Sequence, residues 1–366
     1  MRIGIPREIK NHEYRVGLLP AGVGELVARG HEVFVQAGAG VGAGAEDAAY
    51  HTAGATLVEH PRELFDAAEL IVKVKEPQPE EFNYLRADQV LFTYLHLAPD
   101  PQQAHALLDA GLTAIAYETV TDAHGGLPLL APMSEIAGRM SVQAGAHCLE
   151  KANGGRGVLL GGVPGVEPGH VVVLGAGTVG SNATMIALGM GACVTVIDRS
   201  LDALRRITER FGTRAATLHA SHEAIARSLV DADLVIGAVL VPGGNAPKLI
   251  TRAMLATMRA GSVIVDVAID QGGCCESSRA TTHEAPTYIE QGVVHYCVAN
   301  MPGAVARSAT QALNAATLPH VLALAKGWRQ ALAEDPHLAA GLNVFDGAVA
   351  HAGVADALGM PCRPLA

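Results

Sequence analysis

The chain has 366 residues, 49% of them hydrophobic and 4% aromatic, and its formal net charge is −10. The length predicts two domains of ordinary size, and the abundance of Ala, Val and Gly favours closely packed α/β layers over an aromatic-rich β-sandwich. The acidic balance argues against non-specific nucleic-acid binding. No secretory signal, C-x-x-C pair or uncharged apolar run of about 18 residues is seen, so we expect a reduced, cytoplasmic protein with no membrane span.

The first part of the chain alternates short apolar strands with helices. We predict strands over residues 3–5, 33–35, 70–74, 89–94 and 113–116. Helices are predicted over residues 20–29, 46–53 and 100–110, where Pro20 suits a first helical turn and Asp100 suits an N-cap. This alternation predicts a doubly wound sheet.

A long helix, residues 133–150, leads to a second set of strands. These are predicted over residues 171–174, 193–197, 215–218, 234–236, 263–266 and 293–298. Residues 302–327 are helical in composition, with a break or kink expected at Pro319, and two short helical pieces end the chain. The predicted fold class is α/β, with two doubly wound Rossmann-like domains, parallel sheets and a cleft between the domains.

A glycine-rich turn follows the strand at 171–174. Gly175, Gly177 and Gly180 have the G-x-G-x-x-G spacing. The first glycine permits a tight turn, the second lets the backbone approach a pyrophosphate, and the third lets helix and strand pack closely. Asp198 ends the next strand, where a carboxylate accepts hydrogen bonds from the adenosine ribose and repels a 2′-phosphate. The pattern predicts a site for NAD rather than NADP.

Four ionisable residues are candidates for the chemistry, because ligands of open α/β sheets bind outside the carboxyl ends of the strands. Arg15 suits a substrate carboxylate, and Lys75 suits a carbonyl or a carboxylate. His96 and Asp270 suit acid–base work. Their alternatives are a solvated loop arginine, an exposed lysine, a structural histidine and a helix cap. Lys73 competes with Lys75, but we expect it inside a strand. Together these residues indicate a dehydrogenase for a small anionic substrate.

Blocks along the chain also share the pattern of a known family. They are MRIGIPREIKNHEYRVGLLPAGV, KVKEP, LFTYLHLA, AYETV, LPLLAPMSEIAGRM, GGVPGVEPG, VLGAGTVG, IGAVLVPG, VDVAIDQGGC and HYCVANMPGAV. They resemble bacterial L-alanine dehydrogenase, of the alanine dehydrogenase/transhydrogenase alpha family, from Met1 to about Trp328. The resemblance implies reversible NAD-dependent oxidative deamination of L-alanine to pyruvate, ammonium and NADH by a homohexamer.

The resemblance also implies roles for parts of the chain. Residues 1–130 and 305–366 would form the substrate-binding domain, and residues 131–304 the NAD-binding domain. Arg15 and Lys75 would bind the substrate, and His96 and Asp270 would be the acid–base residues. The residues expected to bind the cofactor are Ser134, Gly175, Gly177, Thr178, Val179, Gly180, Asp198, Val239, Leu240, Val267, Ala268, Ile269, Arg279, Val298, Asn300 and Met301.

Two departures from the family pattern are visible. Ala203 and Ala220 stand where relatives often have polar groups near the adenosine. The Ala325-Lys326-Gly327 stretch lacks a histidine that some relatives have before the matching Gly-Trp, so we expect no metal site.

Three other functions compete with this interpretation. The NAD-binding component of proton-translocating transhydrogenase has a similar RIGIPRE block, but the LFTYLHLA and AIDQGGC blocks favour the amino-acid enzyme. A saccharopine or lysine-pathway dehydrogenase would handle longer substrates. A non-catalytic NAD sensor would not need four convergent ionisable residues.

Overall fold

The computed structural model describes residues 1–241 and 246–363. The chain divides into two compact units. Unit 1 comprises Met1–Met133 and Gly303–Ala366, and unit 2 comprises Ser134–Pro302. Within the described ranges, no helix is long and apolar enough to cross a membrane.

Unit 1 is built on an eight-stranded sheet with the order β15-β14-β6-β5-β4-β1-β2-β3. The strands from β6 to β3 are parallel, whereas β14 and β15 pair antiparallel at one edge. The sheet consists of β1 (Arg2–Ile5), β2 (Glu32–Gln36), β3 (Thr56–Val58), β4 (Leu70–Val72), β5 (Val90–Thr93), β6 (Thr113–Ala116), β14 (Leu342–Phe345) and β15 (Ala348–Val349).

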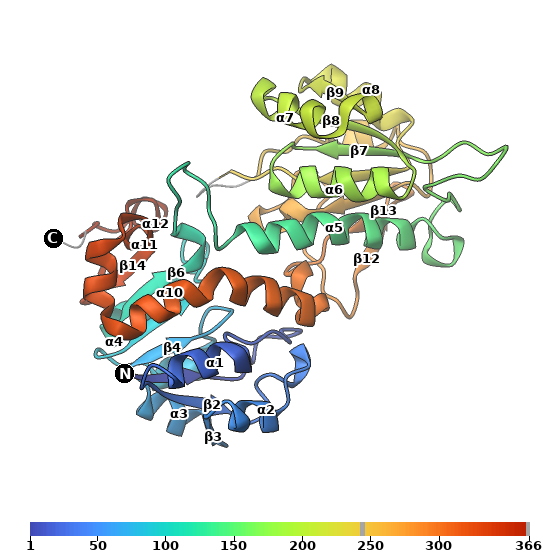
Figure 1. Ribbon diagram of the computed structural model, residues 1–366. Coiled ribbons are helices and arrows are strands. Elements are labelled where there is room, and N and C mark those ends of the chain that lie inside the picture. Colours follow the sequence, from blue (N-terminus) through green and yellow to red (C-terminus); the bar gives the residue numbers. More distant parts are fainter. Residues whose placement is uncertain (242–245, 364–366) are drawn as a thin grey trace. The chain divides into compact units, whose positions relative to one another are not determined.

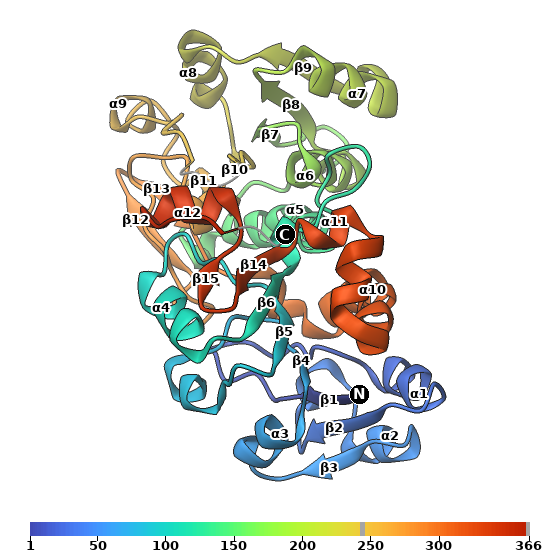
Figure 2. The ribbon, with the colours of Figure 1, turned by 90° about the vertical axis from the view of Figure 1, so that its left-hand side faces the viewer.

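Helices cover both faces of this sheet. One face packs on α3 (Pro61–Ala67), α4 (Pro101–Ala110) and α12 (Ala352–Leu358), through side chains such as Phe65, Leu107 and Val354. Figure 2 shows α3 and α4 on one side of the strands and α1 (Pro20–Val27) and α10 (Ala306–Glu334) on the other. The remaining helices of unit 1 are α2 (Asp47–Thr52), α11 (Pro336–Ala339) and the 3-10 turns η1 (Val41–Ala43), η2 (Pro79–Tyr84) and η3 (Tyr117–Thr119).

Unit 2 is built on a seven-stranded sheet with the order β12-β13-β11-β10-β7-β8-β9. All neighbours are parallel except β12, which pairs antiparallel with β13. The strands are β7 (His170–Leu174), β8 (Cys193–Asp198), β9 (Ala215–His219), β10 (Leu234–Gly237), β11 (Val263–Asp266), β12 (Thr287–Glu290) and β13 (Val293–Tyr296).

Two apolar layers enclose the unit 2 sheet. One face packs on α5 (Ala131–Cys148), α6 (Thr178–Gly189) and α7 (Leu201–Phe211), and the other packs on α8 (His222–Val230) and α9 (Arg252–Leu255). Figure 1 shows α5 alongside α6, and a Cβ at Gly138 of α5 would lie only 2.3 Å from the Val179 carbonyl oxygen of α6. The 3-10 turns are η4 (Lys151–Asn153), η5 (Gly212–Arg214) and η6 (Val267–Gln271), and η7 (Met301–Val305) spans the second boundary between the units.

The α/β class with two doubly wound, mostly parallel sheets is confirmed, but three local predictions were wrong. The antiparallel edge strands β12, β14 and β15 were missed, because each is short. Of these, β14 pairs with β6, far away in the sequence, whereas β12 and β15 form hairpins with the neighbouring strands β13 and β14. The irregularity in α10 lies at Gly327 (φ 158°, ψ 106°), where the backbone is not helical, rather than at Pro319. Strand β4 ends at Val72, so Lys73 follows the strand instead of lying inside it.

Candidate functional site

The candidate substrate residues of unit 1 follow three adjacent parallel strands. Arg15 follows β1, Lys75 follows β4 and His96 follows β5, and these strands are neighbours in the order β5-β4-β1. Since parallel strands end at one edge of a sheet, the three segments meet there. This is where sequence reasoning placed a ligand.

Arg15 is buried and paired within unit 1. Its side chain is 2% exposed, and its Nε and Nη2 donate to the two carboxylate oxygens of Glu13 at 2.7 and 2.5 Å. A third group, Nη1, contacts the sulfur of Met133 at 3.0 Å. Burial works against the charged guanidinium, but the hydrogen bonds and charge of Glu13 outweigh it, so the pKa of Arg15 lies above its usual value. Arg15 is therefore a fixed cation and not a solvated loop residue.

Lys73 also belongs to a buried ionic cluster. Its Nζ lies 2.7 Å from Glu81 Oε1 and 3.3 Å from Glu8 Oε2, and all three side chains are almost fully buried. Burial raises the pKa of Glu8 to about 7, although the Lys73 charge opposes the rise. Lys73 is paired with both carboxylates of this cluster, so we assign it a structural role. Lys75 therefore remains the candidate substrate residue. The reason differs from the one predicted, because Lys73 is excluded by its ion pairs and not by a place inside the strand.

Lys75 is positioned through its backbone. Its N–H donates to Glu8 Oε1 at 3.3 Å, and its carbonyl oxygen accepts the Thr93 hydroxyl at 2.9 Å. The Lys75 side chain is half-buried. The buried carboxylate of Glu8 thus fixes the backbone of Lys75, the residue that we expect to bind the substrate.

His96 has an unusual backbone conformation. Its φ of 49° lies in the left-handed region, which non-glycine residues seldom adopt. Glu118 of η3 accepts the N–H groups of Leu95 at 3.2 Å and of His96 at 2.6 Å, which supports this conformation. The imidazole is 42% exposed and its centroid lies 5.8 Å from the buried Tyr94 ring. Strained residues of this kind are typical of functional sites.

The glycine turn of unit 2 has the geometry of a dinucleotide site. Gly175 has φ 108°, and a Cβ there would lie 2.5 Å from the Ala238 carbonyl oxygen. A Cβ at Gly180 would lie 1.8 Å from the Gly175 carbonyl oxygen, so turn and helix require glycine at both places. At Gly177, the N-cap of α6, a Cβ would meet nothing within 4 Å. The helix N-terminus, with Thr178 and Val179 in its first turn, can therefore receive a pyrophosphate.

Asp198 is held against this turn. Its Oδ2 accepts the Ala176 N–H at 2.6 Å and its Oδ1 accepts the Ser200 N–H at 2.7 Å. Each carboxylate oxygen has a second lone pair for a ribose hydroxyl. The residues present thus fit the ribose and pyrophosphate of a dinucleotide.

Asp270 lies on η6, directly after β11, and is exposed. The turn is anchored by buried Asp266, whose carboxylate accepts the N–H groups of Ala268 at 3.1 Å and Cys274 at 2.8 Å. Gln271 holds the same turn against the segment after β10, because its side-chain amide makes two hydrogen bonds with the backbone of Val241, at 3.0 and 2.8 Å. Asp270 therefore stands on a braced turn at the carboxyl edge of the sheet.

The other predicted cofactor residues of unit 2 differ in burial. Ala268, Ile269, Val298 and Met301 are buried, whereas Leu240 and Arg279 are exposed and Ser134, Val239, Val267 and Asn300 are intermediate. The Arg279 guanidinium lies 3.8 Å from the centre of the Tyr288 ring. Asn300 has φ 60°, and its carbonyl oxygen lies 3.3 Å from His283 Nε2. Segments after β10, β11 and β13 thus bring most of this set to the carboxyl ends of three adjacent strands.

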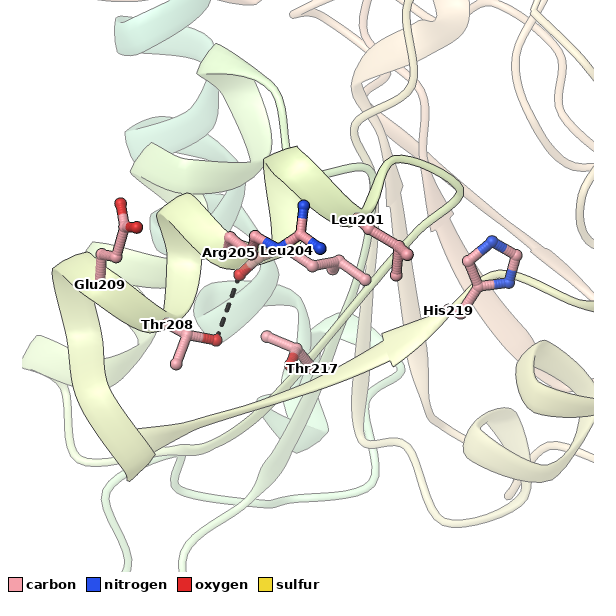
Figure 3. A pocket seen from close by; sticks show the side chains of 7 residues that line it. All are labelled: Leu201, Leu204, Arg205, Thr208, Glu209, Thr217 and His219. Carbon is pink, nitrogen blue, oxygen red and sulfur yellow. Dashed lines mark hydrogen bonds between the residues drawn. The ribbon is translucent and has the colours of Figure 1, made fainter.

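A hollow of about 450 Å³ lies between α7 and edge strand β9 (Figure 3). None of the predicted site residues lines it; its lining residues are Leu201, Leu204, Arg205, Thr208, Glu209, Thr217 and His219. Nearby Ala203 is 5% exposed and belongs to the apolar core, so its side chain offers no polar contact to an adenosine.

Sequence reasoning missed the carboxylates that position the candidate residues. Glu13 holds the Arg15 side chain, and Glu8 and Glu118 hold the backbones at Lys75 and His96. The loop after the first strand does place Glu8 and Glu13 among basic residues that include Arg15. This local pattern does not reveal their burial, which depends on strands distant in the sequence.

Comparison with known proteins covers both units. The profile of the alanine dehydrogenase/PNT N-terminal domain matches residues 4–137, and that of the C-terminal domain matches residues 141–352. An alanine dehydrogenase of Halomonas elongata is 61% identical, over 98% of this chain and 97% of its own. An alanine dehydrogenase of Bacillus subtilis is 54% identical, over 100% of this chain and 96% of its own.

Solved structures give the same picture. A structure of L-alanine dehydrogenase has a TM-score of 0.94 and 52% identity, and covers 98% of this chain and 99% of its own. A transhydrogenase from Sinorhizobium meliloti has a TM-score of 0.82 and 26% identity, and covers 96% of this chain and 99% of its own. The likeness therefore extends over the whole chain and is stronger to the first structure.

Proposed function

Because the chain belongs to the alanine dehydrogenase/PNT family, we propose that it is an L-alanine dehydrogenase, which converts L-alanine, water and NAD reversibly to pyruvate, ammonium and NADH. The observation that carries this proposal is full-length identity of 52–61% to alanine dehydrogenases. The candidate residues at the carboxyl edges of both sheets support it.

In this proposal unit 1 binds the substrate and unit 2 binds NAD. When bound, NAD accepts the hydride that leaves the alanine Cα. The glycine turn holds the pyrophosphate through the α6 N-terminus, and Asp198 holds the adenosine ribose. A 2′-phosphate beside Asp198 would place like charges together, which is the reason for proposing NAD over NADP.

Arg15 and Lys75 bind the substrate. The carboxylate of alanine or pyruvate pairs with the Arg15 guanidinium, whose orientation Glu13 sets. Lys75 donates to the oxygen that develops on the substrate carbon, where it stabilises the charge most in the transition state.

His96 and Asp270 share the proton transfers. The substrate amine must be neutral before hydride leaves, so His96 accepts a proton from the ammonium group. Asp270 then accepts a proton from the water that attacks the iminium carbon. A proton returned to nitrogen makes ammonia the leaving group; as the C–N bond breaks, the hydroxyl of the adduct releases its proton to solvent and the carbonyl of pyruvate forms. In the reverse division of roles Asp270 serves the nitrogen and His96 serves the water.

The test mixes purified protein with NAD and L-alanine at alkaline pH and follows NADH absorbance. We expect NADH to form, and to be consumed when pyruvate and ammonium are added instead. No turnover in either direction would overturn the proposal. Alanine, serine and longer amino acids tested in parallel define the substrate class.

The second candidate is an NAD-binding component of transhydrogenase, favoured by the TM-score of 0.82 to such a protein. This function requires NADH binding but no alanine-dependent turnover. NADH binding by calorimetry, combined with absence of turnover, would therefore select it.

We also propose a cytoplasmic homohexamer, as the resemblance implies. Light scattering at micromolar concentration tests the assembly, and a monomer would contradict it.

A further inference from the structure

A second carboxylate lies beside the candidate acid–base histidine. Glu76 follows Lys75 after β4, and its side chain is 11% exposed. Its Oε1 is paired with the ammonium group of Lys10. Its Oε2 is buried and has no hydrogen-bond partner within the part of the chain that the structure describes. It lies 3.9 Å from Nδ1 of His96.

The Glu76 carboxylate is held in its charged form. Burial alone would favour the neutral acid, but His96, Lys75 and Lys10 together lower the pKa of Glu76 well below its usual range. A buried carboxylate oxygen without a hydrogen bond is unfavourable. The nearby imidazole nitrogen can relieve this, and catalytic hydrogen bonds are often long until substrate binds.

Two other polar groups near His96 in the described part of the chain already have other partners. Glu118 is committed to the backbone N–H groups of Leu95 and His96. The Tyr94 hydroxyl donates to the Leu129 carbonyl oxygen at 2.6 Å, and burial raises the pKa of that phenol. Tyr94 is therefore a neutral neighbour of the ring.

We propose that Glu76 is the positioning residue for His96. Its Oε2 accepts a hydrogen bond from the Nδ1–H group of the imidazole, so that Nε2 carries the lone pair that exchanges protons with the substrate. This assignment rests on the proposed acid–base role of His96. When the N–H bond of the substrate ammonium breaks, its electron pair stays on the substrate nitrogen and the proton binds Nε2. The resulting imidazolium is then stabilised by the Glu76 charge.

Chemical labelling tests the pair without substrate or cofactor. Diethylpyrocarbonate modifies neutral imidazole, and peptide mass spectrometry gives its rate at each histidine. At pH about 6, near the titration of an ordinary histidine, we expect His96 in Glu76→Gln to label at least about threefold faster than in the wild type, because loss of the opposite charge increases the neutral fraction. At pH about 9 the rates should agree, which shows equal accessibility. Exposed His51 is the internal reference.

Two control variants separate this pair from general loosening. Glu80→Gln removes an exposed carboxylate of η2 and should label like the wild type. Lys10→Met removes the ammonium group that pairs with Glu76 but keeps the negative charge of Glu76 beside His96. The labelling of His96 should therefore be no faster than in the wild type. Faster labelling in Lys10→Met, or no change in Glu76→Gln, would overturn the proposal. If Glu76→Gln does not fold, Glu76→Asp keeps the charge and should label like the wild type; labelling at least about threefold faster at pH about 6 would overturn the proposal.

Turnover supplies the second readout. For alanine oxidation, kcat of Glu76→Gln should fall at least about tenfold while the Kd for NADH is unchanged. An unchanged kcat would overturn the positioning role. Wild-type protein that does not oxidise alanine would overturn the proposed function instead, and the labelling comparison would still decide whether Glu76 is paired with His96.

Discussion

The two units build their candidate ligand-binding edges by different physical means. Unit 2 uses backbone: glycines that admit close approach, the N-terminus of α6, and turns braced by Asp266 and Gln271. Unit 1 uses buried charge, with Arg15 paired to Glu13 and Lys73 paired to Glu8 and Glu81. Each arrangement suits its proposed ligand, since a pyrophosphate is recognised by N–H groups and a small carboxylate by a fixed cation.

This difference affects how each edge tolerates change. A backbone site fails when a side chain obstructs it, whereas a site of buried ion pairs fails when one charge loses its partner. Substitutions in the two units should therefore have separable effects on cofactor binding, substrate binding and stability.

The largest expected effect concerns the two residues proposed for acid–base catalysis, His96 and Asp270. Asp270→Asn and His96→Ala should each lower kcat by about 10²–10⁴-fold, because general acid–base groups contribute on that scale. Steady-state kinetics in both directions measure the loss, and fluorescence titration should show unchanged NADH affinity. Near-normal turnover in Asp270→Asn would exclude its role as base, since an amide keeps the size but accepts no proton.

A pair of glycine variants tests the backbone site of unit 2. Gly180→Ala should lower the free energy of unfolding by at least about 2 kcal/mol, because its Cβ would meet the Gly175 carbonyl oxygen at 1.8 Å. Gly177→Ala has space for the methyl group and should keep its stability, yet weaken NADH binding at least about tenfold, because the methyl occupies the approach of the pyrophosphate. Thermal melting and NADH titration check both. Equal stability of the two variants would contradict the prediction.

The buried charge of unit 1 is tested by Arg15→Ala. A charged bidentate contact contributes roughly 1.5–3 kcal/mol, so pyruvate and alanine binding should weaken at least about tenfold while NADH binding stays nearly intact. Lys75→Ala should in addition lower kcat. Calorimetry for both ligands is the measurement, and parallel losses for substrate and NADH would indicate misfolding.

Cofactor choice should respond to Asp198. Asp198→Ala removes the charge that opposes a 2′-phosphate, so the ratio of kcat/KM for NAD to that for NADP should narrow. Wild-type protein that used both cofactors equally well would remove the basis of this assignment.

The smallest effect concerns stability and pH. The pKa of Glu8 is raised from 4.5 to about 7 in the folded protein, so the stability it contributes is complete below pH about 4.5 and is lost as the pH rises through about 7. Across this window the wild type should lose about 1–3 kcal/mol relative to Glu8→Gln, which does not titrate. Urea unfolding at several pH values measures the difference, with Glu80→Gln as the exposed control. Parallel pH profiles of wild type and Glu8→Gln would contradict it.

Local patterns in the sequence predicted the strand, the glycine turn and the helix of the candidate cofactor site in unit 2. The apolar run at β7, the spacing of Gly175, Gly177 and Gly180, and Asp198 at the end of β8 all lie within one βαβ segment, where geometry follows from neighbouring residues. The alternation of strands and helices likewise predicted both doubly wound sheets. Arg15, Lys75, His96 and Asp270 could be selected because strand ends are visible in sequence.

Tertiary structure alone decided the partners of these residues. Glutamate is usually exposed, yet Glu8, Glu13 and Glu76 are buried and Glu118 is partly buried. They lie there because the adjacent strands β1, β4, β5 and β6 end side by side. The structural role of Lys73 was likewise decided by the tertiary structure. It depends on the end of β4 at Val72 and on the ion pair with Glu8 from the loop after β1. Pairing of charges across strands is a long-range property, and so no local pattern in the sequence could reveal it.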